Sequence, residues 1–152
     1  DAFVSHVLAH VTPGPLVDLY AGVGLFSLTA ATAGAGPIIA VEGDRFAARD
    51  LKRNAGRAIS VAELPVEKFA TPAGEAVATV IVDPPRTGMS KAALARSVAI
   101  GAPRFIYVSC DVATLARDAR VLLDAGYRMS FVRAFDLFPN TAHVETVIAF
   151  SR

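Results

Sequence analysis

The chain has a single cysteine and contains no long hydrophobic run. One cysteine excludes an internal disulfide and a metal site built from cysteines, which is typical of a reducing compartment such as the cytoplasm. No apolar run is long enough to span a bilayer. The first residues lack an initiating Met, a basic region and a signal-peptide pattern. We therefore expect a cytoplasmic piece of a longer protein, with no membrane segment.

Charge is also scarce, since only 19% of the residues are charged and the net charge is +1. Charge alone therefore does not indicate a strongly basic nucleic-acid binder. Hydrophobic residues make up 53% of the chain, which suits strands that are buried on both faces. A length of 152 residues fits one domain, 1–152, with a core of its own.

Short apolar runs alternate with helical patterns along the chain. The expected strands cover 16–20, 38–42, 59–64, 78–83, 105–109, 127–134 and 144–150. The expected helices cover 2–11, 25–34, 44–58, 90–101 and the segment from Cys110 to Gly126. This alternation predicts a doubly wound, Rossmann-like α/β sheet of seven mostly parallel strands. Because no helix separates the last two strands, an antiparallel C-terminal strand is expected.

A glycine loop follows the first expected strand and opens a helix. Gly22 and Gly24 would let the backbone approach a ligand and aim free amides at it. Glu42 ends the second strand, where an acidic side chain accepts hydrogen bonds from a ribose diol. A dinucleotide fingerprint would need a third glycine where this chain has Ser27. The pattern favours a mononucleoside-type cofactor such as S-adenosylmethionine over NAD, with an ordinary tight turn as the alternative.

A proline loop ends the fourth expected strand, with the sequence Asp83-Pro84-Pro85-Arg86. Two prolines fix φ and prevent helix formation, so the loop should be rigid. Asp83 could orient a substrate or cofactor group, and Arg86 could hold a phosphate or a carboxylate. The alternative is a plain proline turn with an Asp cap.

Cys110 lies where a hydrophobic strand hands over to a helix. A helix N-terminus stabilises the reactive thiolate, and this edge of a sheet is where α/β proteins bind ligands. The alternative is a structural cysteine. Glu145 stands among apolar neighbours, which suits a base working near neutrality, although a solvent-facing strand residue would look the same.

These segments resemble, in order, the motifs of the S-adenosylmethionine-dependent RNA uridine-5-methyltransferases. The matching segments are 16–28, 41–44, 83–88, 107–118 and 135–147. This family of class I methyltransferases makes 5-methyluridine in tRNA and large-subunit rRNA. The resemblance implies that Tyr20, Glu42 and Asp83 contact S-adenosyl-L-methionine, that Cys110 is the nucleophile and that Glu145 is the base. It also implies an RNA partner for the full-length protein, whose RNA-binding part is absent from this chain.

The chemistry explains why a thiol and a carboxylate are needed together. Carbon C5 of uracil is a poor nucleophile until a thiolate adds at C6. After the methyl group has been transferred to C5, a base must remove the C5 proton before the thiol leaves. Cys110 and Glu145 would supply this pair on one face of a flipped base. Pro84, Pro85, Arg86 and His143 are candidate substrate contacts.

Three segments of the chain depart from the family pattern. The usual Ser-Cys-Asn-Pro reads Ser109-Cys110-Asp111-Val112 here. Asp111 can cap the following helix as Asn would, although a carboxylate beside a thiol disfavours the thiolate. Leu25 and Leu64-Pro65 stand where many relatives have, respectively, an Asn near the cofactor and an acidic residue that meets the adenine.

Other functions stay open at this point. RNA cytosine C5-methyltransferases also form a cysteine adduct, but they commonly carry a cysteine in the loop where this chain has Pro85-Arg86. An amino-directed methyltransferase would explain Asp83-Pro84-Pro85 but would leave Cys110 and Glu145 without a role. A catalytically inactive module that binds cofactor or RNA is a further alternative.

His6 and His10 stand one helical turn apart and could mimic a metal-binding pair. The chain offers no third ligand near them, so we interpret them as part of a surface face. Neither a metal nor an iron–sulfur cluster is expected in this chain.

Overall fold

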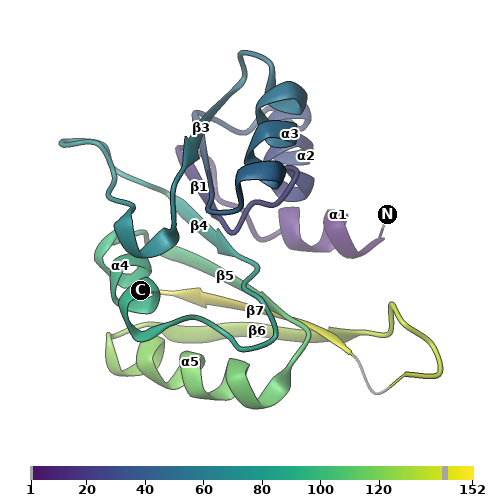
Figure 1. Cartoon of the computed structure of the whole chain (residues 1–152). Helices are drawn as coiled ribbons and strands as arrows, with labels where there is room; N and C mark the ends of the chain where they lie inside the picture. The colour runs from purple at the N-terminus through teal and green to yellow at the C-terminus, as the bar shows by residue number, and fades with distance from the viewer. Residues whose placement is uncertain (1, 142–143) are drawn as a thin grey trace.

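The computed structural model describes residues 2–141 and 144–152. Seven strands form one sheet in the order β3-β2-β1-β4-β5-β7-β6 (Figure 1). The strands are β1 (Leu16–Leu19), β2 (Ile38–Glu42), β3 (Ile59–Glu63), β4 (Thr79–Val82), β5 (Arg104–Ser109), β6 (Arg128–Phe135) and β7 (Glu145–Ser151). Strand β7 runs antiparallel to both of its neighbours, whereas β1 to β5 pair in parallel. The predicted doubly wound sheet with an antiparallel C-terminal strand is confirmed.

The helices connect the strands and cover both faces of the sheet (Figure 1). They are α1 (Ala2–Leu8), α2 (Leu25–Thr32), α3 (Arg45–Ala55), α4 (Lys91–Ala99), α5 (Val112–Asp124) and the 3-10 turn η1 (Val66–Lys68). Several are shorter than expected because local signals end them. Asp44 and Ser90 cap the starts of α3 and α4 by accepting backbone N–H bonds. The turn η1 was not predicted.

Two apolar clusters lie on opposite faces of the sheet because side chains alternate along each strand. On β5, Phe105 and Tyr107 face the layer of α4 and α5, whereas Ile106 and Val108 face the layer of α1, α2 and α3. Burial on both faces explains the high hydrophobic content. The helices cover the two faces of the sheet, so a ligand site is expected at the carboxyl ends of the parallel strands. In open α/β sheets such sites lie where the strand order reverses, which is between β1 and β4 here.

His6 and His10, which we interpreted as part of a surface face, are half-buried and pack against the edge of the sheet. Their Nε2 atoms are buried, and the rings lie 4.9 Å and 4.5 Å from the ring of Phe131 on β6. Burial lowers the pKa of both histidines, which therefore stay neutral near pH 7. The pair packs α1 against the edge strand. Across the described residues, no group of three His, Cys, Asp or Glu side chains could hold a metal ion.

The described helices are all too short or too polar to cross a membrane.

Candidate active site at the carboxyl edge of the sheet

The two glycines of the loop after β1, Gly22 and Gly24, have different structural roles. Gly22 has a φ of 57° and open space where a Cβ would stand, and its N–H donates to Glu42 Oε2 at 2.8 Å. Gly24 has a φ of 104°, and a Cβ there would lie 2.8 Å from Leu51 Cδ1 on α3. Gly24 therefore allows α2 to start close against α3, while Gly22 orients an acidic side chain. The cofactor-binding role of both glycines stays a prediction.

Glu42 is held in place by backbone amides. Its Oε1 accepts from Asp44 N at 2.6 Å while its Oε2 accepts from Gly22 N. Each carboxylate oxygen has a second lone pair. The side chain is thus preorganised and can still accept hydrogen bonds from two hydroxyls of a ligand.

A cavity of about 500 Å³ opens beside Glu42. It is lined by Tyr20, Glu42, Gly43, Pro65, Val66, Glu67, Asp83 and Pro85. Its volume is in the range of small-molecule sites. Four residues that the sequence singled out thus meet around one hollow. A second hollow, of about 260 Å³ beside α1 and α2, is lined by residues without titratable side chains, and so offers no comparable chemistry.

Two cavity residues have raised pKa values. Partial burial raises the pKa of Tyr20 to about 12, so its phenol stays neutral and can donate a hydrogen bond. Asp83 reaches solvent at the cavity, yet desolvation and the negative charges of Glu145 and Asp18 raise its pKa to about 7. A cation bound in the cavity would favour the ionised form of Asp83.

Asp18 is a buried carboxyl that sequence reasoning missed. It accepts hydrogen bonds from Ser27 N at 3.0 Å and Ser27 Oγ at 2.7 Å, and its Oδ1 has no partner among the described residues. Burial raises its pKa to about 6. Ser27 stands where a dinucleotide fingerprint would have its third glycine, and its hydroxyl donates to Asp18 instead. An aspartate inside an apolar strand was the available signal.

Cys110 lies at the turn between β5 and α5 and is half-buried. Asp111 Oδ1 accepts from Thr114 N at 2.8 Å, which confirms the predicted cap of α5. Ser109 Oγ accepts from Asp111 N at 3.1 Å and donates to Asp111 O at 2.9 Å. The thiol is thus carried by a short turn that hydrogen bonds fix on both sides.

Strand pairing brings Glu145 to the same edge. The last pair in the ladder between β5 and β7 is Ser109 with Thr146. Cys110 follows Ser109 and Glu145 precedes Thr146, so they are the next residues beyond this pair on the two segments. Asp83 directly follows β4, the other neighbour of β5. The negative charge of Glu145 is one of the causes that raise the pKa of Asp83, as expected for two carboxyls at the same edge of the sheet.

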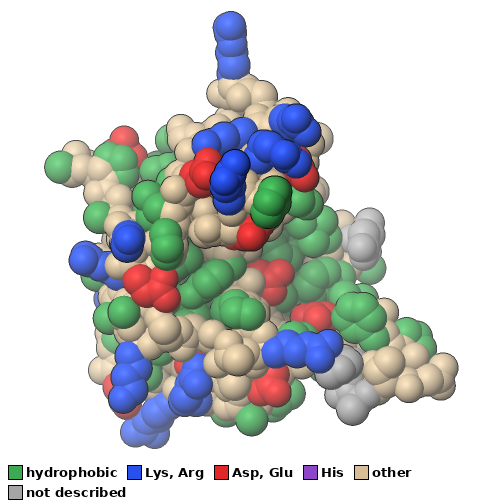
Figure 2. Space-filling model, viewed as in Figure 1, with side chains coloured by type: hydrophobic (Ala, Val, Ile, Leu, Met, Phe, Trp, Pro, Cys, Tyr) green, Lys and Arg blue, Asp and Glu red, His purple; other side chains and the backbone are tan. Residues whose placement is uncertain are grey.

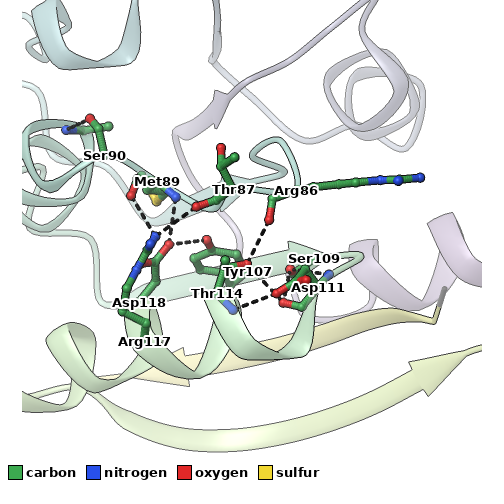
Figure 3. A network of polar contacts seen from close by, with 11 residues as sticks. Arg86, Thr87, Met89, Ser90, Tyr107, Ser109, Asp111, Thr114, Arg117 and Asp118 are labelled. Atoms are coloured by element: carbon green, nitrogen blue, oxygen red, sulfur yellow. Dashed lines mark hydrogen bonds and ion pairs between the residues drawn. The ribbon is translucent and has the colours of Figure 1, made fainter. Parts of the chain in front are cut away.

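A buried network anchors the proline loop to α5 (Figure 3). Asp118 accepts hydrogen bonds from Tyr107 Oη at 2.6 Å, Met89 N at 2.8 Å and Arg117 Nε at 2.8 Å. Arg117 Nη2 also donates to Thr87 O at 3.2 Å and Met89 O at 3.0 Å. The network therefore fixes the loop that carries Asp83 relative to the helix that starts beside Cys110.

The remaining predicted substrate contacts lie in different surroundings. Pro84 is buried, and Pro85 lines the cavity. Arg86 accepts a bond from Thr114 Oγ1 at 3.2 Å through its carbonyl, and its exposed side chain points away from the network (Figure 3). His143 lies outside the described residues. Glu67, which the sequence did not single out, lines the cavity together with Pro65.

We expect Asp118→Ala to lower the free energy of unfolding by about 3 kcal/mol, because it leaves the Tyr107 hydroxyl and the Met89 amide buried without an acceptor. Urea denaturation measures this loss. Asp124→Ala is the matched control, since Asp124 stands on the same helix in an exposed pair with Arg120 and should change stability by less than about 0.5 kcal/mol. Equal losses in the two variants would contradict a stabilising role for the network.

Comparison with known proteins identifies the family. Residues 73–152 match the sequence model of the family described as tRNA (Uracil-5-)-methyltransferase. The chain belongs to this family. The resemblance seen in the sequence motifs is confirmed.

Curated RNA methyltransferases are similar to most of this chain. An uncharacterized RNA methyltransferase of Thermotoga maritima is 37% identical over 137 residues, covering 88% of this chain and 31% of the relative. The 23S rRNA (uracil(1939)-C(5))-methyltransferase RlmD of Acidithiobacillus ferrooxidans is 37% identical over 166 residues, covering 100% of this chain and 37% of the relative. The chain thus spans about a third of the length of these curated relatives.

A solved structure has the same fold. The tRNA (uracil-54, C5)-methyltransferase of Pyrococcus abyssi, in complex with S-adenosyl-L-homocysteine, superposes with a TM-score of 0.87 at 30% identity, covering 98% of this chain and 37% of that chain. Magnesium protoporphyrin IX methyltransferase of Synechocystis, at 15% identity and a TM-score of 0.75, shares the fold alone. The fold is that of the class I methyltransferases.

Proposed function

We propose that this chain is the catalytic domain of an RNA uridine C5-methyltransferase that uses S-adenosyl-L-methionine. One observation carries the proposal. The pairing of β5 with β7 puts Cys110 and Glu145 at the edge where Asp83 and Glu42 line a cavity, in a chain of the uracil-5-methyltransferase family. A thiol, a carboxylate and a cofactor-sized cavity at one edge are what C5 methylation of a pyrimidine requires.

The cavity residues fit S-adenosyl-L-methionine, which would supply an electrophilic methyl group when bound. Glu42 has the free lone pairs to accept from both ribose hydroxyls. Asp83 and Glu67 offer acidic groups for the positive charge of the cofactor, and Tyr20 offers a neutral phenol. A relative that was crystallised with S-adenosyl-L-homocysteine supports this assignment.

In the proposed reaction the Cys110 thiolate adds to C6 of the uracil, and the electron pair displaced from the C5–C6 bond makes C5 nucleophilic. C5 then attacks the methyl carbon of S-adenosyl-L-methionine, and S-adenosyl-L-homocysteine leaves as a neutral thioether. Glu145 removes the proton from C5, the C5–C6 double bond forms again, and the Cys110 thiolate is released. RNA is the expected partner, and its target base must be flipped out to reach this edge.

The loop after β4 supports uridine rather than cytosine as the substrate. It carries Pro84, Pro85 and Arg86, with no thiol, where RNA cytosine C5-methyltransferases commonly place a cysteine. An amino-directed reaction would use Asp83 and leave unexplained why Cys110 and Glu145 lie at the same edge of the sheet.

The identity of the methylated nucleoside tests the proposal. We expect the intact protein, given S-adenosyl-L-methionine with a labelled methyl group and cellular RNA from a strain lacking the protein, to place the label in 5-methyluridine. Nucleoside digestion followed by mass spectrometry measures this. Label in 5-methylcytidine would make the protein a cytosine enzyme. Binding of S-adenosyl-L-homocysteine without any transfer would make it an inactive module.

A further inference from the structure

Helix α3 carries a concentration of positive charge at one end of the sheet. The segment 44–63 contains five basic residues and three acidic ones. Its net charge of +2 exceeds the +1 of the whole chain. Figure 2 shows Lys and Arg side chains gathered at the top of the view, over the region where Figure 1 places α3. The chain is therefore not uniformly neutral, because it carries a local basic face.

A small hollow lies within this basic face, lined by Arg45, Phe46, Arg49 and Glu63, with a volume of about 170 Å³. The Phe46 side chain is 64% exposed, and the Arg49 guanidinium carbon lies 5.8 Å from its ring centre. An exposed aromatic ring beside one arginine, with a second arginine lining the same hollow, is a combination that can stack a base and hold phosphates. We call these three residues, Arg45, Phe46 and Arg49, the α3 patch.

The acidic groups near the α3 patch already have partners. Glu63 Oε2 lies 2.6 Å from Lys52 Nζ. Asp50 is shared between Arg49 and Arg53 at 3.5 Å and 3.6 Å, in exposed pairs. Exposed pairs of this kind contribute little to stability. Arg49 can therefore exchange its contact for a phosphate at small cost.

The α3 patch lies on the same edge as the proposed active site but at a distance from it. Arg45 starts α3 directly after β2, and Glu63 ends β3, where it pairs with Glu42. Strand β3 stands four strand spacings from β5 in the sheet order, which is roughly 19 Å at about 4.8 Å per spacing. A nucleotide at the α3 patch would therefore be a different one from the base at Cys110.

We propose that the α3 patch binds a single-stranded segment of the RNA substrate beyond the target nucleotide. Arg45 and Arg49 contact backbone phosphates, and a base stacks on Phe46. The inference rests on the proposed function, which makes RNA the partner expected at this edge of the sheet. It extends the RNA contact of this domain past the cofactor cavity, although the chain as a whole is nearly neutral.

The test is RNA binding by the intact protein with the double variant Arg45→Ala/Arg49→Ala. The probe is a fluorescein-labelled single-stranded RNA with one uridine, titrated by fluorescence anisotropy over a series of salt concentrations. We expect Kd to rise about tenfold and the slope of log K against log salt to become shallower by about 1.4, since each phosphate contact with a single strand contributes about 0.7. Phe46→Ala should raise Kd about tenfold, and Phe46→Tyr should restore binding.

The control removes two charges elsewhere. Arg120→Ala/Arg128→Ala makes the same change in net charge at an exposed position of α5 and at the start of β6, and should leave Kd within about twofold. Calorimetry with S-adenosyl-L-homocysteine should give unchanged affinity in all variants, which shows an intact cofactor cavity. Equal Kd values in the patch and control variants would overturn the inference. A higher Kd with an unchanged salt slope in the arginine double variant would also overturn it.

The two proposals fail in different ways. If the wild-type protein forms 5-methyluridine but the patch variants bind RNA as the control does, the α3 patch is not an RNA site and the proposed function stands. If the patch variants lose RNA binding but the wild type transfers no methyl group to uridine, the RNA site stands and the proposed function fails.

Discussion

Cys110→Ala is expected to abolish methyl transfer, with a loss on the order of 10⁴-fold or more, because the proposed nucleophile has no substitute within this chain. RNA containing 5-fluorouridine makes the step visible. Fluorine at C5 cannot leave as a proton does, so the wild-type protein with cofactor should form a covalent complex that survives denaturing electrophoresis. Cys110→Ala should form none.

Two controls separate chemistry from folding in this experiment. Because Cys110 lies at a turn outside both apolar clusters, its alanine variant should unfold at the wild-type urea concentration and bind S-adenosyl-L-homocysteine normally. Asp111→Asn keeps the cap on α5 while removing the carboxylate beside the thiol, so it should form the adduct at least as fast as the wild type. A Cys110→Ala variant that retains the adduct would overturn the assignment of the nucleophile.

Glu145→Gln is expected to lower kcat by about 10² to 10⁴-fold and to trap the methylated base on the protein. A glutamine cannot accept the C5 proton, so the C5–C6 double bond does not form again and the Cys110 thioether persists. Electrophoresis of labelled RNA under denaturing conditions should show the complex with ordinary uridine, and its mass should include the added methyl group.

Asp83 is the carboxylate to compare with Glu145, because both stand at the same edge of the sheet and desolvation helps to raise the pKa of Asp83 to about 7. If Asp83→Asn traps the methylated adduct and Glu145→Gln turns over normally, the base is Asp83. If Asp83→Asn instead weakens binding of S-adenosyl-L-homocysteine without trapping an adduct, Asp83 contacts the cofactor as proposed. Glu75→Gln, which changes an exposed carboxylate in the loop before β4, should behave as the wild type.

Much of the fold could be predicted because its elements have strong local signals. The strand limits in the structure lie within one residue of those expected, since each strand is an apolar run bounded by turn residues. The helix ends were less predictable. Gly56, with a φ of 57°, ends α3 just after Ala55, before the expected limit.

The features missed are contacts between side chains of different elements of the fold. Asp118 draws together Tyr107 and the backbone of Met89, which lies 29 positions away. Asp18 and Ser27 belong to different elements that meet only when α2 packs on β1. In a sequence these side chains look like ordinary polar residues in or beside apolar segments, because partners across the core leave no local pattern.

The sequence by itself determined the order of strands and helices and the position of the chemistry-bearing residues at strand ends, because hydrophobic periodicity and turn residues act over short distances. Only the tertiary structure decided which of those ends meet. Strand β7 enters antiparallel between β5 and β6, so the first residue of one strand, Glu145, arrives beside Cys110, which follows the last residue of another. That pairing depends on side chains of both layers packing at once, which no single segment encodes.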